Sequence, residues 1–147
     1  MIVAGAVLLL LLLLSGCSSV QDTVNDACSD VKDVVNAVPK FGDPTHAGVT
    51  VPALTKQIEA AQKAQQAFER ADVGFRGSWE RMIKALQESV TAWKGWDNKS
   101  RPGASDMYFM LRLGDAKKGV DEAKGALNAA AGKSGFTECG ERIQWKY

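Results

Sequence analysis

Residues 79–93 of the chain, WERMIKALQESVTAW, decide the expected fold. The apolar side chains in this stretch recur at alternating steps of four and three residues, at Trp79, Ile83, Leu86, Val90 and Trp93. Such spacing places them on one face of an α-helix, where a single stripe can be buried against the rest of a protein. The stretch is therefore predicted to be an amphipathic helix.

The same period recurs in three further segments of the chain. Their apolar stripes are Val20, Val24, Ala27, Val31, Val34 and Val38 in the first, Val51, Leu54, Ile58, Ala61, Gln65 and Phe68 in the second, and Phe109, Leu113, Ala116, Val120, Ala123, Leu127 and Ala130 in the last. Polar segments rich in turn-forming residues, at 39–49 and 97–105, separate the helices. The sequence thus predicts an all-α fold, an antiparallel bundle of about four helices.

Two of these segments have side chains of complementary size. In heptad terms, bulky residues in one stand against small residues in the other, namely Trp79, Leu86 and Trp93 against Ala116, Ala123 and Ala130. Large-against-small layers let two helices interdigitate at close range. We expect the third and fourth helices to be the most closely packed neighbours.

The second segment also carries polar residues of interest. Gln65 lies on its apolar stripe, either as a buried amide or at the edge of the bundle, and we expect the edge. Lys56, Lys63 and Arg70 recur every seven residues on the outer face. We interpret them as a solvated face, with a binding strip as the alternative.

The N-terminus carries an apolar run from Ile2 to Leu14. As a helix this run spans roughly 20 Å, which is shorter than the hydrocarbon layer of a bilayer. Its end, Leu14-Ser15-Gly16-Cys17, resembles the lipobox of bacterial lipoprotein signal peptides. The resemblance implies that residues 1–16 are a signal peptide, and that Cys17 receives a diacylglyceryl thioether and becomes the first mature residue. The alternative is an uncleaved anchor helix, because the first residues lack the positive charge typical of signal peptides.

Residues 17–147 carry every charged side chain of the chain, 18 basic and 17 acidic. With the charges nearly balanced, no positive excess attracts nucleic acid or anionic lipid headgroups. The stretch is long enough for one domain with a core but too short for two. We expect a single helical domain over 17–147 that does not bind nucleic acid.

With Cys17 assigned to lipid, Cys28 and Cys139 remain as an even pair. In an exported protein such a pair favours a disulfide over two free thiols. Cys28 flanks the apolar stripe of the first helix, and the helical pattern fades after Ala131. The expected disulfide would therefore tie a C-terminal tail to the bundle.

Few residues are suited to chemistry. His46, the one histidine, lies in a loop without the oriented partner of a catalytic histidine or the companion ligands of a zinc site. No GxSxG, HExxH, P-loop or dinucleotide-binding glycine pattern occurs. We expect neither an enzyme nor a bound metal or cofactor.

Four side chains are candidates for contact with a partner: His46, Trp96, Trp145 and Tyr147. The histidine lies in the loop between the first two helices, Trp96 lies one turn after Trp93 but off the stripe, and the other two end the chain. Amphipathic rings at such positions can anchor an interface or stack on a ligand. The alternative is that the rings pack, half-buried, over an end of the bundle.

These features predict a lipid-anchored, non-enzymatic binding module at a bacterial membrane, facing outside the cytoplasm, with a protein partner at that membrane. Only Ser18 and Ser19 separate Cys17 from the first helical stripe, so the domain would stay close to the bilayer. Phage- and plasmid-encoded exclusion lipoproteins are one candidate of this kind. The alternative is a carrier that holds a small ligand inside the bundle.

Overall fold

The computed structural model describes residues 4–38, 47–97 and 106–147, and within them the side chains of 20–38, 50–96 and 106–147. This part of the chain forms four α-helices and a short 3-10 helix: α1 (Ala4–Ala37), α2 (Ala47–Ala71), α3 (Arg76–Asp97), α4 (Asp106–Lys133) and η2 (Thr137–Cys139). No strand occurs among the described residues. The all-α fold predicted from the apolar period is confirmed.

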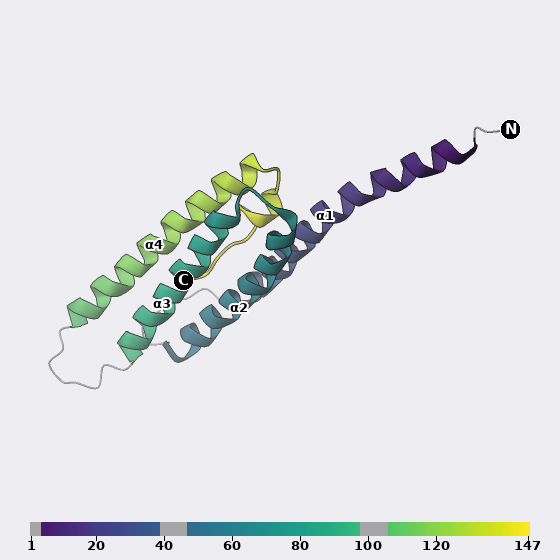
Figure 1. Cartoon of the computed structure of the whole chain (residues 1–147). Helices are drawn as coiled ribbons and strands as arrows, with labels where there is room; N and C mark the ends of the chain where they lie inside the picture. The colour runs from purple at the N-terminus through teal and green to yellow at the C-terminus, as the bar shows by residue number, and fades with distance from the viewer. Residues whose placement is uncertain (1–3, 39–46, 98–105) are drawn as a thin grey trace.

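Successive helices run antiparallel and lie side by side in chain order (Figure 1). The most extensive contact joins α3 to α4, as the complementary side-chain sizes predicted. In the described part, α1 packs on α2 but on neither of the other helices, so the four helices do not form a closed ring. The C-terminal tail contacts both outer helices through η2 and lies between them.

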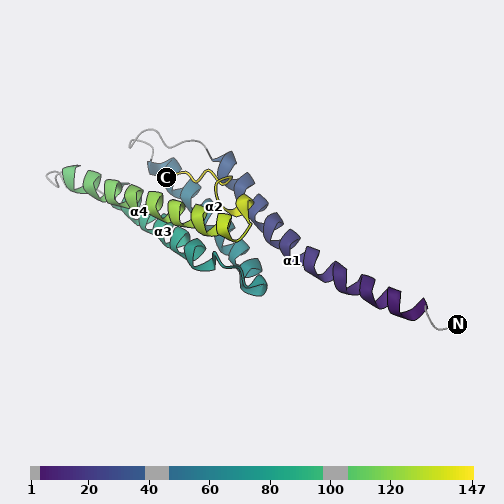
Figure 2. The same ribbon diagram turned by 90° about the horizontal axis from the view of Figure 1, so that it is seen from above.

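The first part of α1 extends away from the bundle in both views (Figures 1 and 2). Among the described helices, none has a stretch that is long and apolar enough to cross a membrane.

The core is built around Trp79 of α3, which is fully buried. Its indole Nε1–H donates a hydrogen bond to the carbonyl oxygen of Ala61 at 2.9 Å. The ring centroid lies 4.8 Å from that of Phe68 and 5.7 Å from that of Trp145, both in edge-to-face geometry. The hydrogen bond satisfies the only polar atom of the indole, so the tryptophan occupies the core without an unpaired donor.

The stripes predicted for α3 and α4 are buried to different extents. In α3, Trp79, Ile83 and Leu86 are buried, as predicted. In α4, burial begins only at Val120, and the earlier stripe residues are partly exposed. The physical reason is that, of the helices in the described residues, α3 alone lies beside α4, and the tail covers only the second half of α4.

The stripe predicted for α1 divides into two faces, which corrects the single stripe expected. Its buried face consists of Val24, Val31 and Val38 together with Cys28 and Val35. The other predicted members, Val20, Ala27 and Val34, lie on an outer face; Val20 is 46% exposed and the other two are half-buried. Because α2 is the one described α-helix that packs on α1, the apolar surface of α1 is wider than the core can cover.

A buried amide of α2 holds the C-terminal tail. The side chain of Gln57 is fully buried; its Nε2–H donates to the carbonyl oxygen of Lys146, and its Oε1 accepts from the Lys146 backbone N–H, both at 3.1 Å. Gln65, expected at the edge of the bundle, is half-buried, with its Nε2 3.5 Å from Glu80 Oε1. The amide that is buried in the core is therefore Gln57, which the apolar stripe had not singled out.

A close approach between the tail and α4 depends on Gly140. A Cβ added at this position would lie 3.2 Å from the Cα of Asn128 and 3.3 Å from the Cβ of Ala131. The first of these atoms is backbone and cannot move aside at low cost. Glycine is therefore the residue that lets the tail pack against α4 at this distance.

Replacing Gln57 by Met is expected to lower the free energy of unfolding by about 1–3 kcal/mol, because it keeps the side-chain volume but leaves the Lys146 backbone groups without their partners. Urea unfolding measures the change. The matched control is Gln65→Met on the same helix, for which we expect a change within about 0.5 kcal/mol. Equal losses in the two variants would show that the amide does not hold the tail.

Candidate functional site

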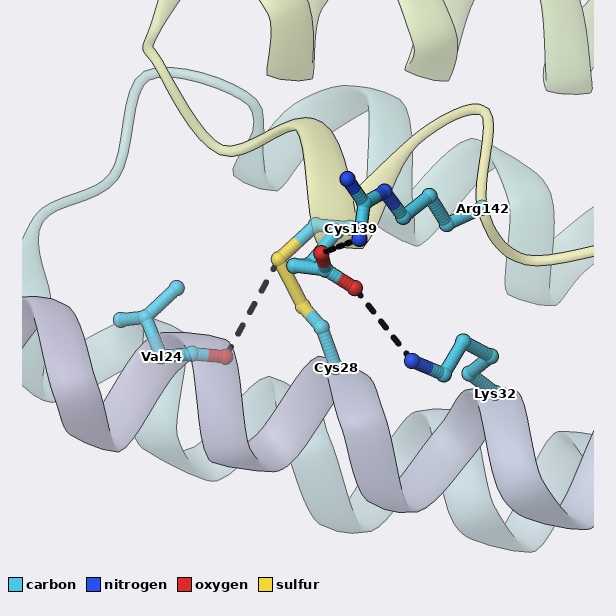
Figure 3. A network of polar contacts seen from close by, with 6 residues as sticks. Val24, Cys28, Lys32, Cys139 and Arg142 are labelled. Carbon is cyan, nitrogen blue, oxygen red and sulfur yellow. Dashed lines mark hydrogen bonds and ion pairs between the residues drawn. A yellow bond between two sulfur atoms is a disulfide. The ribbon is translucent and has the colours of Figure 1, made fainter.

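The disulfide that ties the tail to α1 is present, as the cysteine pair predicted. Cys28 of α1 and Cys139 of η2 are bonded, fully buried, and 5.0 Å apart at their Cα atoms (Figure 3). The Sγ of Cys139 lies 3.9 Å from the carbonyl oxygen of Val24, a van der Waals contact because a disulfide sulfur carries no hydrogen. Glu138, beside the disulfide, pairs with Lys32 of α1 at 3.4 Å and with Arg142.

Two of the residues singled out in the sequence are not covered by the described side chains. His46 lies outside the described residues. Cys17 lies in the helical part of α1, but its side chain is outside the described part. The lipid attachment at Cys17 and a partner contact at His46 therefore stay predictions.

Trp145 is buried, which corrects its assignment to a surface contact. Only 4% of the residue is exposed, and its ring packs edge-on against Trp79 in the core. The tail is held over the bundle by the disulfide and by Gln57, so the indole is drawn into the interior. Sequence position alone could not show this, because a residue near the end of a chain is usually exposed.

Tyr147 is half-buried and bound to α4. Its phenol O–H donates to Asp121 Oδ1, and the Nζ of Lys117 lies 2.9 Å from Asp121 Oδ2 and 5.2 Å from the phenol ring centroid. Burial, followed by the hydrogen bond to Asp121, raises the pKa of Tyr147 from 10.0 to about 12. The hydrogen bonds from Tyr147 and Lys117 lower the pKa of Asp121. These contacts hold the last residue of the described chain against the bundle.

This contact predicts a loss of stability at high pH. The folded protein holds the Tyr147 proton more tightly than the unfolded chain does. The protonated phenol therefore contributes to the free energy of unfolding below pH 10, and this contribution is lost as the pH rises to about 12. Urea unfolding should therefore show that the free energy of unfolding falls over this pH range. The fall should be smaller in Tyr147→Phe, which has no phenol to ionise. If the two proteins lose the same stability, the contact with Asp121 does not contribute.

A cluster of exposed apolar side chains begins α4, and we call it the distal patch. Its members are between 55% and 71% exposed: Met107, Tyr108, Met110 and Leu111. The residue between them, Phe109, turns toward α3, where a Cβ at Gly95 would lie 3.6 Å from its ring. Large apolar residues that are exposed together, and not singly, typically mark a surface that contacts another molecule.

The sequence pattern did not predict the distal patch, because the single apolar stripe of this helix includes Phe109 and none of the four patch residues. Residues 107–111, MYFML, are apolar all around the helix, whereas a helix on the surface of a monomer needs only one apolar face. The sequence signal of the patch is therefore the excess of apolar residues in this stretch beyond the single stripe that contains Phe109. The exposure of the patch follows from the packing of α4, which among the described helices has only α3 beside it, and only the structure shows this.

The distal patch lies at the end of the bundle opposite the projecting start of α1 (Figure 1). Trp96, half-buried near the end of α3, is at this same end because α3 finishes where α4 begins. Within the patch, the guanidinium of Arg112 lies 5.7 Å from the centroid of the Tyr108 ring, and its Nη1–H donates to Tyr108 Oη at 3.3 Å. The structure thus adds an apolar surface at the same end of the bundle as one predicted contact residue, Trp96.

Chemical sites are not evident in the described part of the chain. No group of three or more His, Cys, Asp or Glu side chains is arranged there to hold a metal ion. The strongest features are an exposed apolar patch and open grooves between the helices, which suit recognition of another molecule. Comparison with protein-family models, curated proteins and solved structures finds no match for this chain.

Proposed function

We propose that this protein is a lipid-anchored component of the bacterial cell envelope that binds another protein at the same membrane and has no enzymatic activity. The observation that carries the proposal is the distal patch, in which four large apolar side chains are exposed at one end of a helical scaffold. Leaving these side chains in water is unfavourable, and a partner that covers them gains the corresponding free energy.

The residue types in the distal patch suit a protein partner. Methionine adapts its shape to the surface it meets, and tyrosine is enriched at the centres of protein interfaces. Tyr108 is already held by the ring of Phe109, at 5.4 Å between centroids, and by Arg112. A side chain that is positioned before binding loses less entropy in the complex.

The anchor at Cys17 supplies the location in this proposal. The helix from Cys17 to Ala37 is about 30 Å long at 1.5 Å per residue. If α1 stands upright on the bilayer, the distal patch faces away from the membrane at about that height. The partner would then be a membrane or envelope protein whose outer domain reaches this level.

Lipidation is tested by intact-mass spectrometry of the membrane fraction. The expected species begins at Cys17 and carries a diacylglyceryl adduct, and Cys17→Ser should remain unprocessed and unmodified. Two or more acyl chains give durable attachment, whereas a single chain is marginal. A wild-type chain that keeps residues 1–16 without any lipid would contradict the proposed anchor.

Binding through the distal patch is tested by photocrosslinking in intact cells. A photoreactive residue at Met107 or Met110 should crosslink to a protein, whereas one at Lys118, exposed later on the same helix, should not. Met110→Glu should weaken the recovered complex by more than about tenfold, because a charge replaces an apolar contact. Crosslinks only to lipid, or a purified protein that carries a small molecule inside the bundle, would favour a membrane contact or the carrier function instead.

A further inference from the structure

An open groove of about 790 Å³ runs between the outer faces of α1 and α2. Its floor is made of small and β-branched apolar residues that are half-buried or buried: Ala27, Val34, Ala60, Ala64 and Ala67. Small side chains on both helices allow another helical surface to approach the backbone closely. Nothing in the described part of the chain covers this face, since α3 and α4 pack on the other side of α2 or beyond it.

The apolar residues of this outer face repeat every seven positions. On α1 the repeat is Val20, Ala27 and Val34, and on α2 it is Ala53, Ala60 and Ala67. None of the six is buried in the core, although Ala27, Ala60 and Ala67 pack against it. A seven-residue repeat keeps side chains on one seam of a slightly supercoiled helix, which is the pattern of helices that pair with other helices.

The two rims of the groove carry opposite charges. The rim on α1 consists of Asp26, Asp30 and Asp33, and the rim on α2 consists of Lys56 and Lys63 with Glu59 between them. All six side chains are exposed, and within the described residues no ion pair joins one rim to the other. The groove therefore presents an apolar floor between an acidic edge and a mainly basic edge.

The charges on the two rims also match in spacing. Asp26 and Asp33 are seven residues apart, as are Lys56 and Lys63, a rise of about 10.5 Å in each helix. Because α1 and α2 run antiparallel along one groove, the order of the rim charges on α1 is reversed on α2. Asp33 and Lys56 lie toward the ends of the helices that follow one another in the chain, Asp26 and Lys63 lie toward the opposite ends, and Asp30 and Glu59 lie between them. Each pair of rims therefore offers two opposite-charge matches and one like-charge match.

We propose that this face binds a second copy of the chain, with a two-fold axis parallel to the helices. In this dimer α1 of each protomer lies antiparallel over α2 of its partner, and the two alanine-rich floors pack together. The acidic rim of each copy then faces the basic rim of the other at the same level. Charges that flank an apolar seam in this way select the partner and its orientation.

The charge pattern excludes the other face-to-face arrangement. A two-fold axis perpendicular to the helices would stack α1 on α1 and bring the three aspartates of one copy against those of the other. Like charges placed opposite one another are unfavourable. The parallel axis also leaves both α1 N-termini pointing the same way, which agrees with two lipid anchors in one membrane. The inference goes beyond the proposed function and does not depend on it.

The test uses the full chain in detergent, with its mass measured by light scattering over a range of concentrations. The wild-type protein should be a dimer. The variant Asp26→Lys/Asp33→Lys and the variant Lys56→Asp/Lys63→Asp should each dimerise about 100-fold more weakly, because each faces its own charge. An equal mixture of the two should recover a heterodimer, since basic rims then meet acidic rims in both halves.

The control is Lys84→Asp/Lys118→Asp, which makes the same change of charge on exposed positions of α3 and α4 and should leave the dimer intact. A monomeric wild-type chain overturns the proposal, and so do charge variants that each remain dimeric alone. Folded variants, shown by helical circular dichroism, that do not combine in the mixture also overturn it. The lipidation and distal-patch experiments change none of the charged rim residues of the groove, so they succeed or fail separately.

Discussion

Removing the Cys28–Cys139 disulfide is expected to lower the free energy of unfolding by about 4–5 kcal/mol. The two cysteines are 111 residues apart, so the bond restrains nearly the whole described domain in the unfolded state. The double variant Cys28→Ala/Cys139→Ala avoids leaving a free thiol, and both positions are fully buried. Urea unfolding of the variant and of the oxidised wild type measures the difference.

The same variant should release the C-terminal tail. Trp145 is buried only while the tail lies over the core, so its loss from the interior should shift the tryptophan emission to longer wavelength. The reduced wild-type protein is the matched control, because it lacks the same bond without any change of sequence. A double variant whose stability stays within about 1 kcal/mol of the wild type would show that the helices alone hold the fold.

Trp79→Ala is expected to lower the free energy of unfolding by about 3–5 kcal/mol. The indole is fully buried, contacts the rings of Phe68 and Trp145, and donates to the carbonyl of Ala61. Alanine leaves a cavity where α2, α3 and the tail meet, and it removes that hydrogen bond. Chemical denaturation with circular dichroism at the helical minimum measures the loss.

The matched control for this variant is Trp96→Ala on the same helix. Trp96 is half-buried near the end of α3, so its removal should cost clearly less than the removal of Trp79. Similar losses for the two would contradict the position of Trp79 at the centre of the core. Because Trp96 lies at the same end of the bundle as the distal patch, its variant also serves as a separate probe of partner binding.

The stripe of α3 could be predicted because its helix has neighbours on both sides. Trp79, Ile83 and Leu86 are buried against α2 and α4, so one continuous apolar face is what packing requires. The stripe of α1 could be predicted only in part. Its apolar residues cover two faces, and which of them enters the core depends on the packing of α1, which in the described part of the chain has α2 as its one α-helical neighbour.

The candidate site could be predicted only in part. The cysteine pairing followed from the number of cysteines and the expected compartment. A partner contact at Trp96 stays a prediction, although this residue lies at the same end of the bundle as the distal patch. Trp145 was misplaced because nothing local in the tail shows that Gln57 and Gly140 draw it over the bundle. The distal patch was overlooked because exposure is decided by what lies beside a helix.

The sequence by itself determined the helices, their number, the disulfide partners and the balance of charge, because these follow from local periodicity and composition. Only the tertiary structure decided which apolar residues are buried, since burial depends on contacts between segments far apart in the chain. Val24 and Val20 have the same side chain on the same helix, yet the first is in the core and the second is largely exposed. Their difference arises from the open arrangement of the helices and from the tail that lies between α1 and α4.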